Sequence, residues 1–514
     1  DDRKEWLSNY NRDLYLDTNK DSVSYNDFID REMIHFSKYD CDRSIPNIMD
    51  GLKISLRKIL YSAFKKNLTS EIKVAQFSGY VSEHSGYHHG EASLNAAIVG
   101  LAQNFVGSNN INLFDPNGQF GTRLQGGKDS ASERYIYTQL NKITRTIFPS
   151  SDDYILKYLD DDGTPVEPIY YAPIIPMVIV NGSKGIGTGF STEILPYHVP
   201  KIVDYLKRKL NSETTDDILF TPYFEGFKGR VQHIENGKYL VVGKYSVLED
   251  KRIRVSELPI GTWTDDYKQY LETLMETVDK KGKKIVPIVK EYDDMSKSTN
   301  VDIIITFNEN LAQILETNTV EYDCNGLEKI LKLYTTVSTS NMHMFDSNEC
   351  LKKYSSVPEI IDDYFEPRLK LYEDRKKYQL DALLKELKIM KNKQRYIQEI
   401  LDETLDLRKK SKEVILNMMK EKEYDIINED SEYKYLLKMT MDSVSEENVE
   451  KIKKTLEETQ SKYDELFNTT IQEMWINDLN VFEKNYDSYV IERRELCENE
   501  FIDKKSTKKI KKKK

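Results

Sequence analysis

Glycine and proline are absent from the last part of the chain, and this absence limits the possible fold more than any other feature. All 22 glycines and all 14 prolines of the 514 residues lie at or before Pro367, and Lys, Glu and Leu dominate the residues that follow. A segment with this composition is typical of long helices. We therefore predict that residues 356–497 are largely helical.

Apolar residues in this region recur at alternating steps of three and four, which is the seam pattern of a coiled coil. One run consists of Leu380, Leu383, Leu387, Met390, Ile397 and Leu401, and a second of Val449, Ile452, Leu456, Tyr463 and Leu466. Because a chain must return to pack its own seam, the two runs predict an antiparallel helical hairpin with a small helical knob at its tip. Taken alone, the periodicity fits a plain helical bundle equally well.

The preceding residues divide into two further parts. Residues 25–165 show short helical patterns separated by Gly-rich turns, which predict a compact helical domain. Residues 166–355 predict a mixed α/β domain, because the runs 168–180, 239–242 and 301–306 are rich in β-branched residues. The chain is therefore expected to be an α+β protein of several domains.

The net charge of −11 argues mildly against a nucleic-acid partner, because phosphate binding needs a positive surface. Only local clusters of Lys and Arg would suit such a partner. One cluster is the basic tail, residues 498–514, which we expect to be a nucleic-acid tail, a nuclear import signal or a solvated end. No stretch is apolar enough to span a bilayer, so no membrane partner is predicted.

A cationic helix is predicted after Gly51. Its apolar positions are Leu52, Leu56, Ile59 and Leu60. Lys53, Arg57 and Lys58 lie mostly on the other faces, and cations at a helix start suit phosphate oxygens. An isolated cationic face is, however, more often merely solvated.

His88 and His89 come directly before a second predicted helix. Free backbone N–H groups and the positive end of the helix dipole attract phosphate at such a position, and an imidazole can donate a hydrogen bond to it or exchange a proton with it. The pair could instead cap the helix or bind a metal ion. The metal is disfavoured, because no third ligand lies nearby in the sequence.

A glycine-rich loop, residues 118–135, ends in the pair Arg134-Tyr135. Its glycines let the backbone approach a ligand closely, while Arg123, Lys128 and Arg134 supply positive charge. A phenol loses its proton only near about pH 10, so attack on a phosphodiester would need such cations. By residue type alone, packing is the commoner role for any of the 34 tyrosines.

Several motifs occur in an order and spacing that resemble one enzyme family, the type IIA DNA topoisomerases of the eukaryotic or viral kind. They are Arg-Ser-Ile-Pro-Asn-Ile-Met-Asp-Gly-Leu-Lys (43–53), Tyr-His-His-Gly-Glu (87–91), Leu-Ala-Gln-Asn-Phe-Val-Gly-Ser-Asn-Asn (101–110), Gln-Phe-Gly-Thr-Arg (119–123), Gly-Gly-Lys-Asp (126–129), Arg-Tyr-Ile-Tyr-Thr (134–138) and Ile-Ile-Pro-Met-Val-Ile-Val-Asn-Gly-Ser-Lys-Gly-Ile-Gly-Thr-Gly (174–189). Ile54 departs from the family, which usually has proline there. The resemblance begins at residues 2–6, which are similar to the stretch after the family's metal-binding Toprim domain, and extends to about residue 495.

The resemblance implies four catalytic residues. Tyr135 would attack DNA and become linked to a 5′-phosphate, and Arg134 would stabilise the scissile phosphate. His89 and Arg43 would assist through hydrogen bonds and proton transfer.

It also implies DNA-binding residues. Lys53, Arg57 and Lys58 match positions that hold the DNA backbone, and the other DNA-binding candidates are His88, Arg123 and Lys128. Ile186 matches an isoleucine that wedges between bases and bends the duplex. Unstacking a base step costs on the order of a few kcal/mol, which added backbone contacts can offset.

In the family's architecture, residues 1–24 would be a linker from the Toprim region and 25–165 a winged-helix domain that carries the catalytic tyrosine. Residues 166–355 would be a tower domain. Residues 356–497 would be a long antiparallel coiled coil with a helical C-gate, through which two copies form a homodimer. Each copy would then cut one strand of double-stranded DNA so that another duplex can pass, as in an ATP-dependent type II topoisomerase.

No metal site is expected within the chain itself. The four cysteines form no Cys-x-x-Cys pair, and the acidic runs 40–42 and 160–162 do not follow apolar strands and read as solvated turns. By the resemblance, Mg²⁺ and ATP would be bound by Toprim and ATPase regions that these residues lack, on the same full-length protein or on a separate subunit. The expected compartment is the nucleus, or the cytoplasm for a viral protein.

Two other functions stay open. A gyrase A or topoisomerase IV subunit is less well suited, because no propeller-like repeats follow the helical region and the His-His form fits the eukaryotic or viral enzymes. A non-catalytic DNA-bending architectural protein would share the basic helices and the hairpin. The substitution Tyr135→Phe would leave such a protein functional.

Overall fold

The computed structural model describes residues 2–498 apart from residues 18, 20, 188, 236, 279–283, 285, 313, 315–321, 428–429, 431 and 441–444. The described residues form two compact units. Unit 1 comprises residues 2–150, 156–368 and 478–498, and unit 2 comprises residues 151–155 and 369–477. The basic tail predicted at 498–514 lies outside the described residues from 499 onward.

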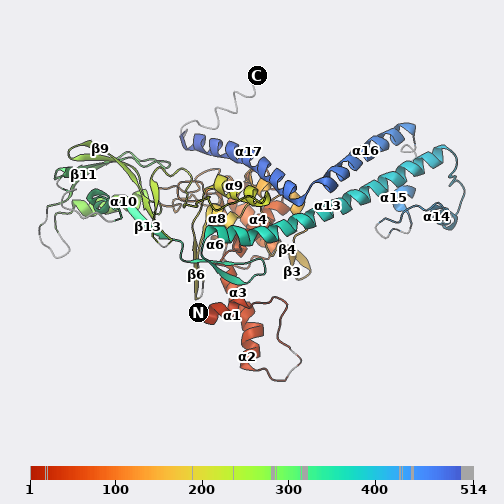
Figure 1. Ribbon diagram of the computed structural model, residues 1–514, viewed down its shortest axis with the longest axis horizontal. Coiled ribbons are helices and arrows are strands. Elements are labelled where there is room, and N and C mark those ends of the chain that lie inside the picture. The colour runs from red at the N-terminus through yellow and green to blue at the C-terminus, as the bar shows by residue number, and fades with distance from the viewer. Residues whose placement is uncertain are drawn as a thin grey trace, which may run out of the picture. The chain divides into compact units, whose positions relative to one another are not determined.

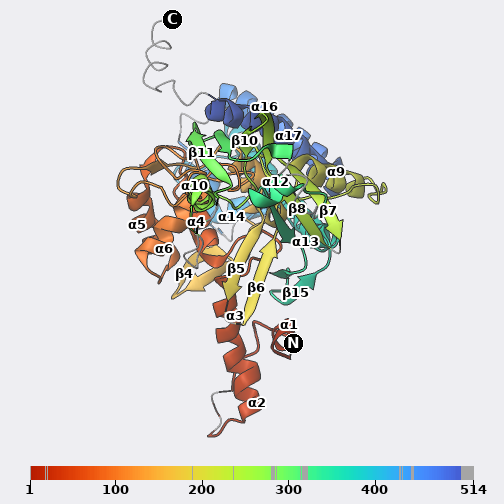
Figure 2. The ribbon, with the colours of Figure 1, turned by 90° about the vertical axis from the view of Figure 1, so that its left-hand side faces the viewer.

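Unit 1 begins with a short helix and a longer helical rod. Helix α1 (Asp2–Ser8) precedes α2 (Tyr25–Phe28), a π-helical turn η1 (Ile29–Met33) and α3 (Ile34–Asp42). Right-handed helical dihedrals continue through both junctions, so the last three elements form one rod that projects from the rest of unit 1 (Figures 1 and 2). Asp40 and Asp42, expected in a solvated turn, lie instead in the last turn of α3, because Asp42 pairs with Lys38 one turn earlier at 2.7 Å.

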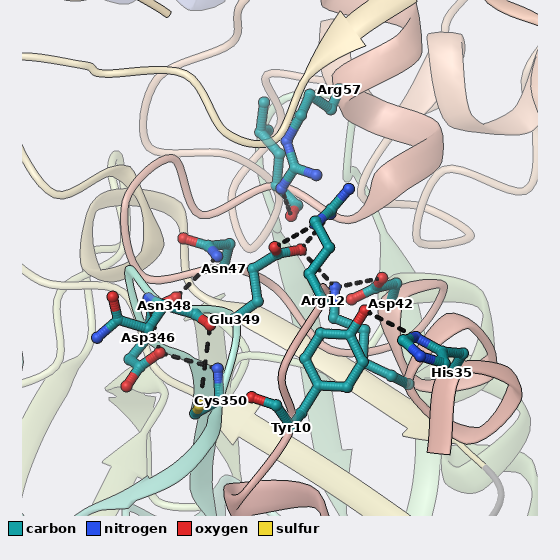
Figure 3. Close-up of polar contacts among 12 residues, drawn as sticks. Tyr10, Arg12, His35, Asp42, Asn47, Arg57, Asp346, Asn348, Glu349 and Cys350 are labelled. Atoms are coloured by element: carbon teal, nitrogen blue, oxygen red, sulfur yellow. Dashed lines mark hydrogen bonds and ion pairs between the residues drawn. The ribbon is translucent and has the colours of Figure 1, made fainter. Parts of the chain in front are cut away.

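A buried ion-pair network fixes this N-terminal segment to a turn late in the chain. The carboxylate of Glu349 accepts a hydrogen bond from Arg12 Nε at 2.7 Å (Figure 3). It accepts a second from Lys38 Nζ at 2.9 Å. Glu349 lies between two paired antiparallel strands, β14 (Met342–Phe345) and β15 (Leu351–Tyr354). Two cations that share one buried carboxylate are stable only in a fixed geometry, so the network holds the rod and this turn in register.

Three packed helices follow the rod: α4 (Ile54–Lys65), α5 (Val74–Ser85) and α6 (Glu91–Ala102) (Figure 2). Gly51 has a φ of 68° before α4, and a Cβ atom there would lie 2.5 Å from the backbone nitrogen of Val178. Of the predicted apolar face, Leu52 before α4 and Ile59 and Leu60 on it are buried, and Leu56 is partly buried. Strands β1 (Ile72–Lys73) and β2 (Tyr137–Thr138) pair antiparallel beside α5.

The next segment contains short elements: α7 (Thr144–Ile147), the 3-10 turn η2 (Ser150–Asp152), β3 (Tyr158–Asp161), β4 (Thr164–Pro168), α8 (Met177–Asn181), β5 (Ser183–Gly187) and β6 (Phe190–Ile194). The prediction of strand for residues 168–180 is wrong beyond Pro168, because Pro173 and Pro176 offer no N–H groups to a ladder and the buried residues that follow form α8. Asp160 and Asp161, expected in a solvated turn, lie on β3. Strands β5 and β6 form an antiparallel hairpin.

Besides the pairs β5–β6 and β14–β15, the described residues of the predicted mixed α/β part form a four-stranded and a three-stranded antiparallel sheet. Its elements are α9 (Val199–Leu210), β7 (Arg230–Glu235), β8 (Lys238–Val242), β9 (Lys244–Glu249), β10 (Arg252–Glu257), α10 (Thr264–Met275), β11 (Val289–Asp294), β12 (Ile303–Phe307), α12 (Gly326–Ile330) and β13 (Tyr334–Ser338). The strand orders are β11-β12-β10-β9 and β13-β8-β7. The strands predicted at 239–242 and 301–306 are confirmed as β8 and β12. Alternate residues of β10 and β12, such as Ile253 and Ile305, face a core that also holds Leu271 of α10.

Unit 2 is helical. Its elements are most of α13 (Val357–Leu401), then α14 (Lys412–Glu421), α15 (Lys434–Leu437), α16 (Glu446–Asn468) and the start of α17 (Ile471–Glu498). Helices α13 and α16 run antiparallel, since Lys376 contacts the carbonyl of Phe467 at 2.9 Å and Met390 contacts Thr459 at 3.9 Å (Figure 1). A separate hydrophobic core lies where α13 ends and α16 begins. It contains Tyr396, Ile397, Leu405, Met419, Tyr424, Tyr433 and Leu436. Leu401, predicted on the seam, is 38% exposed because α13 ends there.

Candidate nucleic-acid interface

Tyr135 is the last residue of a turn, in which its N–H donates to the carbonyl oxygen of Ser132 at 2.9 Å, and the residues on either side of it are fixed to the start of α5. The N–H groups of Val74 and Ala75 donate to the carbonyl oxygens of Ile136 at 3.0 Å and Glu133 at 3.1 Å. Ile136 is 1% exposed, whereas Tyr135 is 77% exposed. Burial of Ile136 anchors the backbone directly after the turn, while the side chain of Tyr135 stays in solvent. The phenol is therefore presented to solvent on a fixed backbone.

A second group, made up of Arg43, Lys58, His88 and His89, lies at the other end of α5. The pKa of His89 is below its ordinary value, because the ring is partly buried and because Arg43, His88 and Lys58 add positive charge. The hydroxyl of Tyr39 lies 3.4 Å from His89 Nε2. A neutral imidazole flanked by cations can donate a hydrogen bond to a phosphate oxygen. This group therefore suits an anionic ligand.

Ile186 lies on the β5–β6 hairpin and is 79% exposed. Ser44 Oγ donates to the carbonyl oxygen of Ile186 at 3.0 Å, and Lys53 Nζ donates to that of Lys184 at 2.7 Å. Gly185 permits this approach, because a Cβ atom there would overlap the carbonyl oxygen of Ser44. The hairpin is thus held against the residues that follow α3, as both ribbon views show (Figures 1 and 2).

The structure does not bring Arg57 to this surface. Arg57 Nε lies 2.6 Å from Asp50 Oδ2, and its Nη2 donates to Asp50 Oδ1 at 3.1 Å and to the carbonyl of Leu52 at 3.0 Å. Asp50 is fully buried and also accepts from the backbone N–H of Tyr171 at 2.9 Å. Its guanidinium neutralises a buried carboxylate and fixes the turn before α4, and the expectation that Arg57 grips the DNA backbone stays a prediction. Lys58 is partly buried and pairs with Glu167 at 2.8 Å.

Arg123 is likewise buried, and its guanidinium pairs with Glu257 at the end of β10. Its charge is matched by this buried carboxylate, and the expectation that Arg123 binds DNA stays a prediction. Lys128 and Arg134, on the same loop, are exposed. These two cations of the loop remain available to an anion.

The four expected catalytic residues fall into two groups. Tyr135 and Arg134 lie at the start of α5, and Arg43 and His89 at its end; a helix of twelve residues is about 18 Å long. Within the described part of the chain, no hydrogen bond or ion pair joins the two groups. The expectation that all four residues act on one phosphate stays a prediction.

Three contributing residues were missed by the sequence reasoning. Tyr39 contacts His89, Ser44 supports the hairpin, and Lys184 presents an exposed side chain beside Ile186. Tyr39 and Ser44 flank Arg43 in the sequence, and Lys184 flanks Ile186. Proximity to a motif is thus the signal that could have identified them.

The described residues offer no metal centre, since nowhere among them do three or more His, Cys, Asp or Glu side chains converge to hold an ion. Among the described residues, Cys324 and Cys350 form no disulfide. In the same part of the chain, no helix is both long enough and apolar enough to cross a membrane.

Comparison with known proteins identifies two family matches. The family of DNA gyrase A and its topoisomerase IV counterpart matches residues 43–480, and the C-terminal associated domain of TOPRIM matches residues 1–41. The boundary between the two matches falls at the end of α3.

The chain is 40% identical to DNA topoisomerase 2 of Plasmodium falciparum over 519 residues, which cover 94% of this chain and 36% of that protein. It is 39% identical to DNA topoisomerase 2 of Arabidopsis thaliana, covering 94% of this chain and 35% of that protein. The human DNA topoisomerase 2-alpha is 42% identical over 83% of this chain and 28% of its own length. The chain therefore spans about a third of the length of these relatives.

A crystal structure of the DNA-binding, cleavage and re-ligation domain of Plasmodium falciparum topoisomerase II is similar to the whole chain. The TM-score is 0.86 at 39% sequence identity, and the match covers 98% of this chain and 69% of that one.

Proposed function

The chain belongs to the type IIA DNA topoisomerase family, and on that premise we propose that it is the DNA breakage-and-rejoining region of an ATP-dependent type II DNA topoisomerase. The observation that carries the proposal is Tyr135. Its side chain is exposed on a backbone that α5 holds in place, with the exposed Arg134 next to it. A nucleophile in such a position needs no rearrangement of the chain before it meets a duplex.

In the proposed reaction, the hydroxyl oxygen of Tyr135 attacks a backbone phosphorus. The bond from phosphorus to the 3′ oxygen breaks, that oxygen takes up a proton, the phenol gives up its own, and the phosphate stays on Tyr135 through its 5′ side. Arg134 stabilises the charge that develops on the phosphate. The reverse attack by the 3′ hydroxyl rejoins the strand.

Arg43 and His89 assist at the phosphate, with His89 acting as a neutral hydrogen-bond donor. Lys53, Lys58, His88 and Lys128 hold the backbone of the duplex. Ile186 wedges between bases and bends the DNA, which brings more backbone into contact with the protein.

Two copies act together, because each tyrosine cuts one strand of a double-stranded break. In this proposal residues 25–165 form the winged-helix domain, 166–355 the tower, and 356–497 a coiled coil with the helical C-gate of a homodimer. The compartment is the nucleus, or the cytoplasm for a viral protein.

Mg²⁺ and ATP would be bound by Toprim and ATPase regions, on the same polypeptide or on a separate subunit. The described residues do not form a metal site, so no step above is assigned to a metal ion. Bound at a Toprim region, Mg²⁺ would stabilise negative charge on the reacting phosphate.

Covalent trapping tests the proposal. The chain is mixed with end-labelled duplex and Mg²⁺, with and without a Toprim-containing partner, and then denatured. We expect protein-linked DNA that requires the partner and disappears in Tyr135→Phe. Tyr137→Phe is the matched control, because Tyr137 lies two residues further along and is also exposed. If DNA binds and no adduct forms under any condition, the protein is a DNA-bending architectural protein and the assignment of Tyr135 is wrong.

A further inference from the structure

The tip of the glycine-rich loop, residues 123–126, rests on the edge where β10 ends and α10 begins. The N–H groups of Thr264 and Asp265 donate to the carbonyl oxygens of Arg123 at 3.4 Å and of Leu124 at 3.0 Å. Gln125 Nε2 also donates to Asp265 Oδ2 at 3.0 Å. The backbone N–H groups at the start of α10, which have no partner within the helix, therefore donate to the loop tip.

A buried ion pair fixes the same contact. Arg123 is 6% exposed and Glu257 is 1% exposed, and one carboxylate oxygen of Glu257 accepts from the guanidinium. The other oxygen accepts from the backbone N–H of Lys228 at 3.1 Å. Removing two charges from water costs free energy, and this desolvation cost is offset only when the two groups meet in one geometry. The pair therefore selects a single position of the loop.

The indole ring of Trp263 lies directly over Gly126. A Cβ atom at Gly126 would overlap this ring, and Gly126 has a φ of 62°, which favours glycine. Phe105 meets the same indole edge-on, with ring centroids 5.7 Å apart. The absence of a side chain at Gly126 thus lets the loop close onto the tryptophan.

Contacts within the loop connect this tip to Tyr135. Thr122 donates to Asp129 through its N–H at 2.8 Å and its hydroxyl at 2.6 Å. Further along, the N–H of Ala131 donates to the carbonyl of Gln119 at 2.9 Å. The loop is therefore braced from its tip to the segment that carries Tyr135.

We propose that Glu257 and Trp263 are positioning residues for the nucleophile: they clamp the tip of the loop and thereby fix where Tyr135 meets the scissile phosphate. They touch neither DNA nor the reacting atoms, and the inference rests on the proposed function of Tyr135. With the loop docked, the Tyr135 hydroxyl lies at one distance from the phosphorus. With the loop undocked, that distance varies. A misplacement of about 1 Å can cost about 100-fold in rate.

The test combines a spectroscopic signal with a rate. The chain is labelled with 5-fluorotryptophan, and the fluorine resonance of Trp263 is assigned with Trp263→Phe. Glu257→Gln is then compared with the unchanged chain for this resonance, for DNA affinity, and for the rate of covalent adduct formation with a Toprim-containing partner. We expect the Trp263 resonance to move, the resonances of Trp6 and Trp475 to stay, and the adduct rate to fall by about 10- to 100-fold at unchanged DNA affinity.

Asp302→Asn is the matched control. It breaks the ion pair with Arg254 of β10, at 2.7 Å, whose guanidinium is half-exposed. It should alter neither the Trp263 resonance nor the adduct rate. Should Glu257→Gln fail to fold, Gly126→Ala is the second variant, because it pushes the loop off the indole without touching the buried carboxylate.

A shifted resonance with an unchanged adduct rate would overturn the positioning role, and an unmoved resonance in both variants would overturn the clamp itself. If the unchanged chain forms no adduct, the proposed function fails and the positioning role falls with it. The fluorine signal distinguishes that case, because it reports loop docking without any DNA chemistry.

Discussion

Ser44 donates its hydroxyl hydrogen bond to the carbonyl oxygen of Ile186 across 142 residues of sequence, at 3.0 Å. Arg43, the neighbour of Ser44, belongs to the positive group around His89. One stretch of backbone after α3 thus supports both the proposed DNA wedge and a proposed phosphate contact. A movement of this stretch would therefore displace both Ile186 and Arg43.

Gly185→Ala should weaken DNA bending. Its Cβ atom would overlap the carbonyl oxygen of Ser44, so the hairpin must move away. Overpacking of this kind costs about 1–3 kcal/mol, and we expect the population of bent duplex to fall by about tenfold. Fluorescence transfer between labelled DNA ends measures the bend, with Ile186→Ala as the reference for loss of the wedge.

Gly187→Ala is the control for that change. At Gly187 the nearest atom to a Cβ would be Ser44 Cβ at 3.5 Å, an ordinary contact. Bending should be nearly normal in this variant. Equal bending by Gly185→Ala and the unchanged protein would show that the hairpin does not depend on its seat against Ser44.

Arg43→Gln should raise the pKa of His89. Burial and three positive neighbours hold this pKa below its ordinary value of 6.5, and the substitution removes one of the three. A titration followed by NMR of the imidazole would measure the rise. His198, whose pKa is lowered mainly by its own burial, should keep its midpoint. No change at His89 would mean that Arg43 does not act on it.

Glu349→Gln should cost stability in a pH-dependent way. Burial alone would raise the pKa of Glu349, but hydrogen bonds and charges from Arg12 and Lys38 outweigh it and lower the pKa from 4.5 to about 2 (Figure 3). A carboxylate with a lowered pKa stabilises the fold above its unfolded value, so the contribution of about 3 kcal/mol is complete above about pH 5. It declines as the pH falls from about 4.5 toward 2.

Unfolding curves of the two proteins between about pH 2 and pH 6 measure this difference, because that range includes both the decline and the plateau above about pH 5. The control is Glu193→Gln, which breaks the exposed pair with Lys184 and should change stability by at most about 0.5 kcal/mol. A stability difference that grows with rising pH above about pH 5 would contradict the assignment.

The sequence predicted the elements whose signal is local. The strands at 239–242 and 301–306, the helix after Gly51 and the helical region beyond Pro367 all depend on periodicity and composition along one segment, and all are present. The prediction of a strand at 168–180 was wrong. A continuous apolar run is typical of a buried strand, but here its prolines prevent strand pairing and its buried residues form α8.

The candidate site was predicted less completely. A sequence shows which residues are cationic, but it does not show which of them pair with a carboxylate in the fold. Arg57 and Arg123 look like the other cations of their motifs, but Asp50, seven residues before Arg57, and Glu257, from a distant part of the chain, pair with them. Glu257 lies 134 residues from Arg123, a separation that no local pattern spans.

Substitution of these cations separates the two roles in solution. Lys128→Gln removes an exposed charge, so the slope of DNA affinity against salt should fall by about one while stability stays the same. Arg57→Gln leaves the buried carboxylate of Asp50 unpaired, which should cost about 3–5 kcal/mol of stability. Its salt slope, measured below its melting temperature, should match that of the unchanged protein, because Arg57 contributes no charge to the surface. A lower slope with normal stability in Arg57→Gln would mean that this guanidinium leaves Asp50 and reaches the DNA.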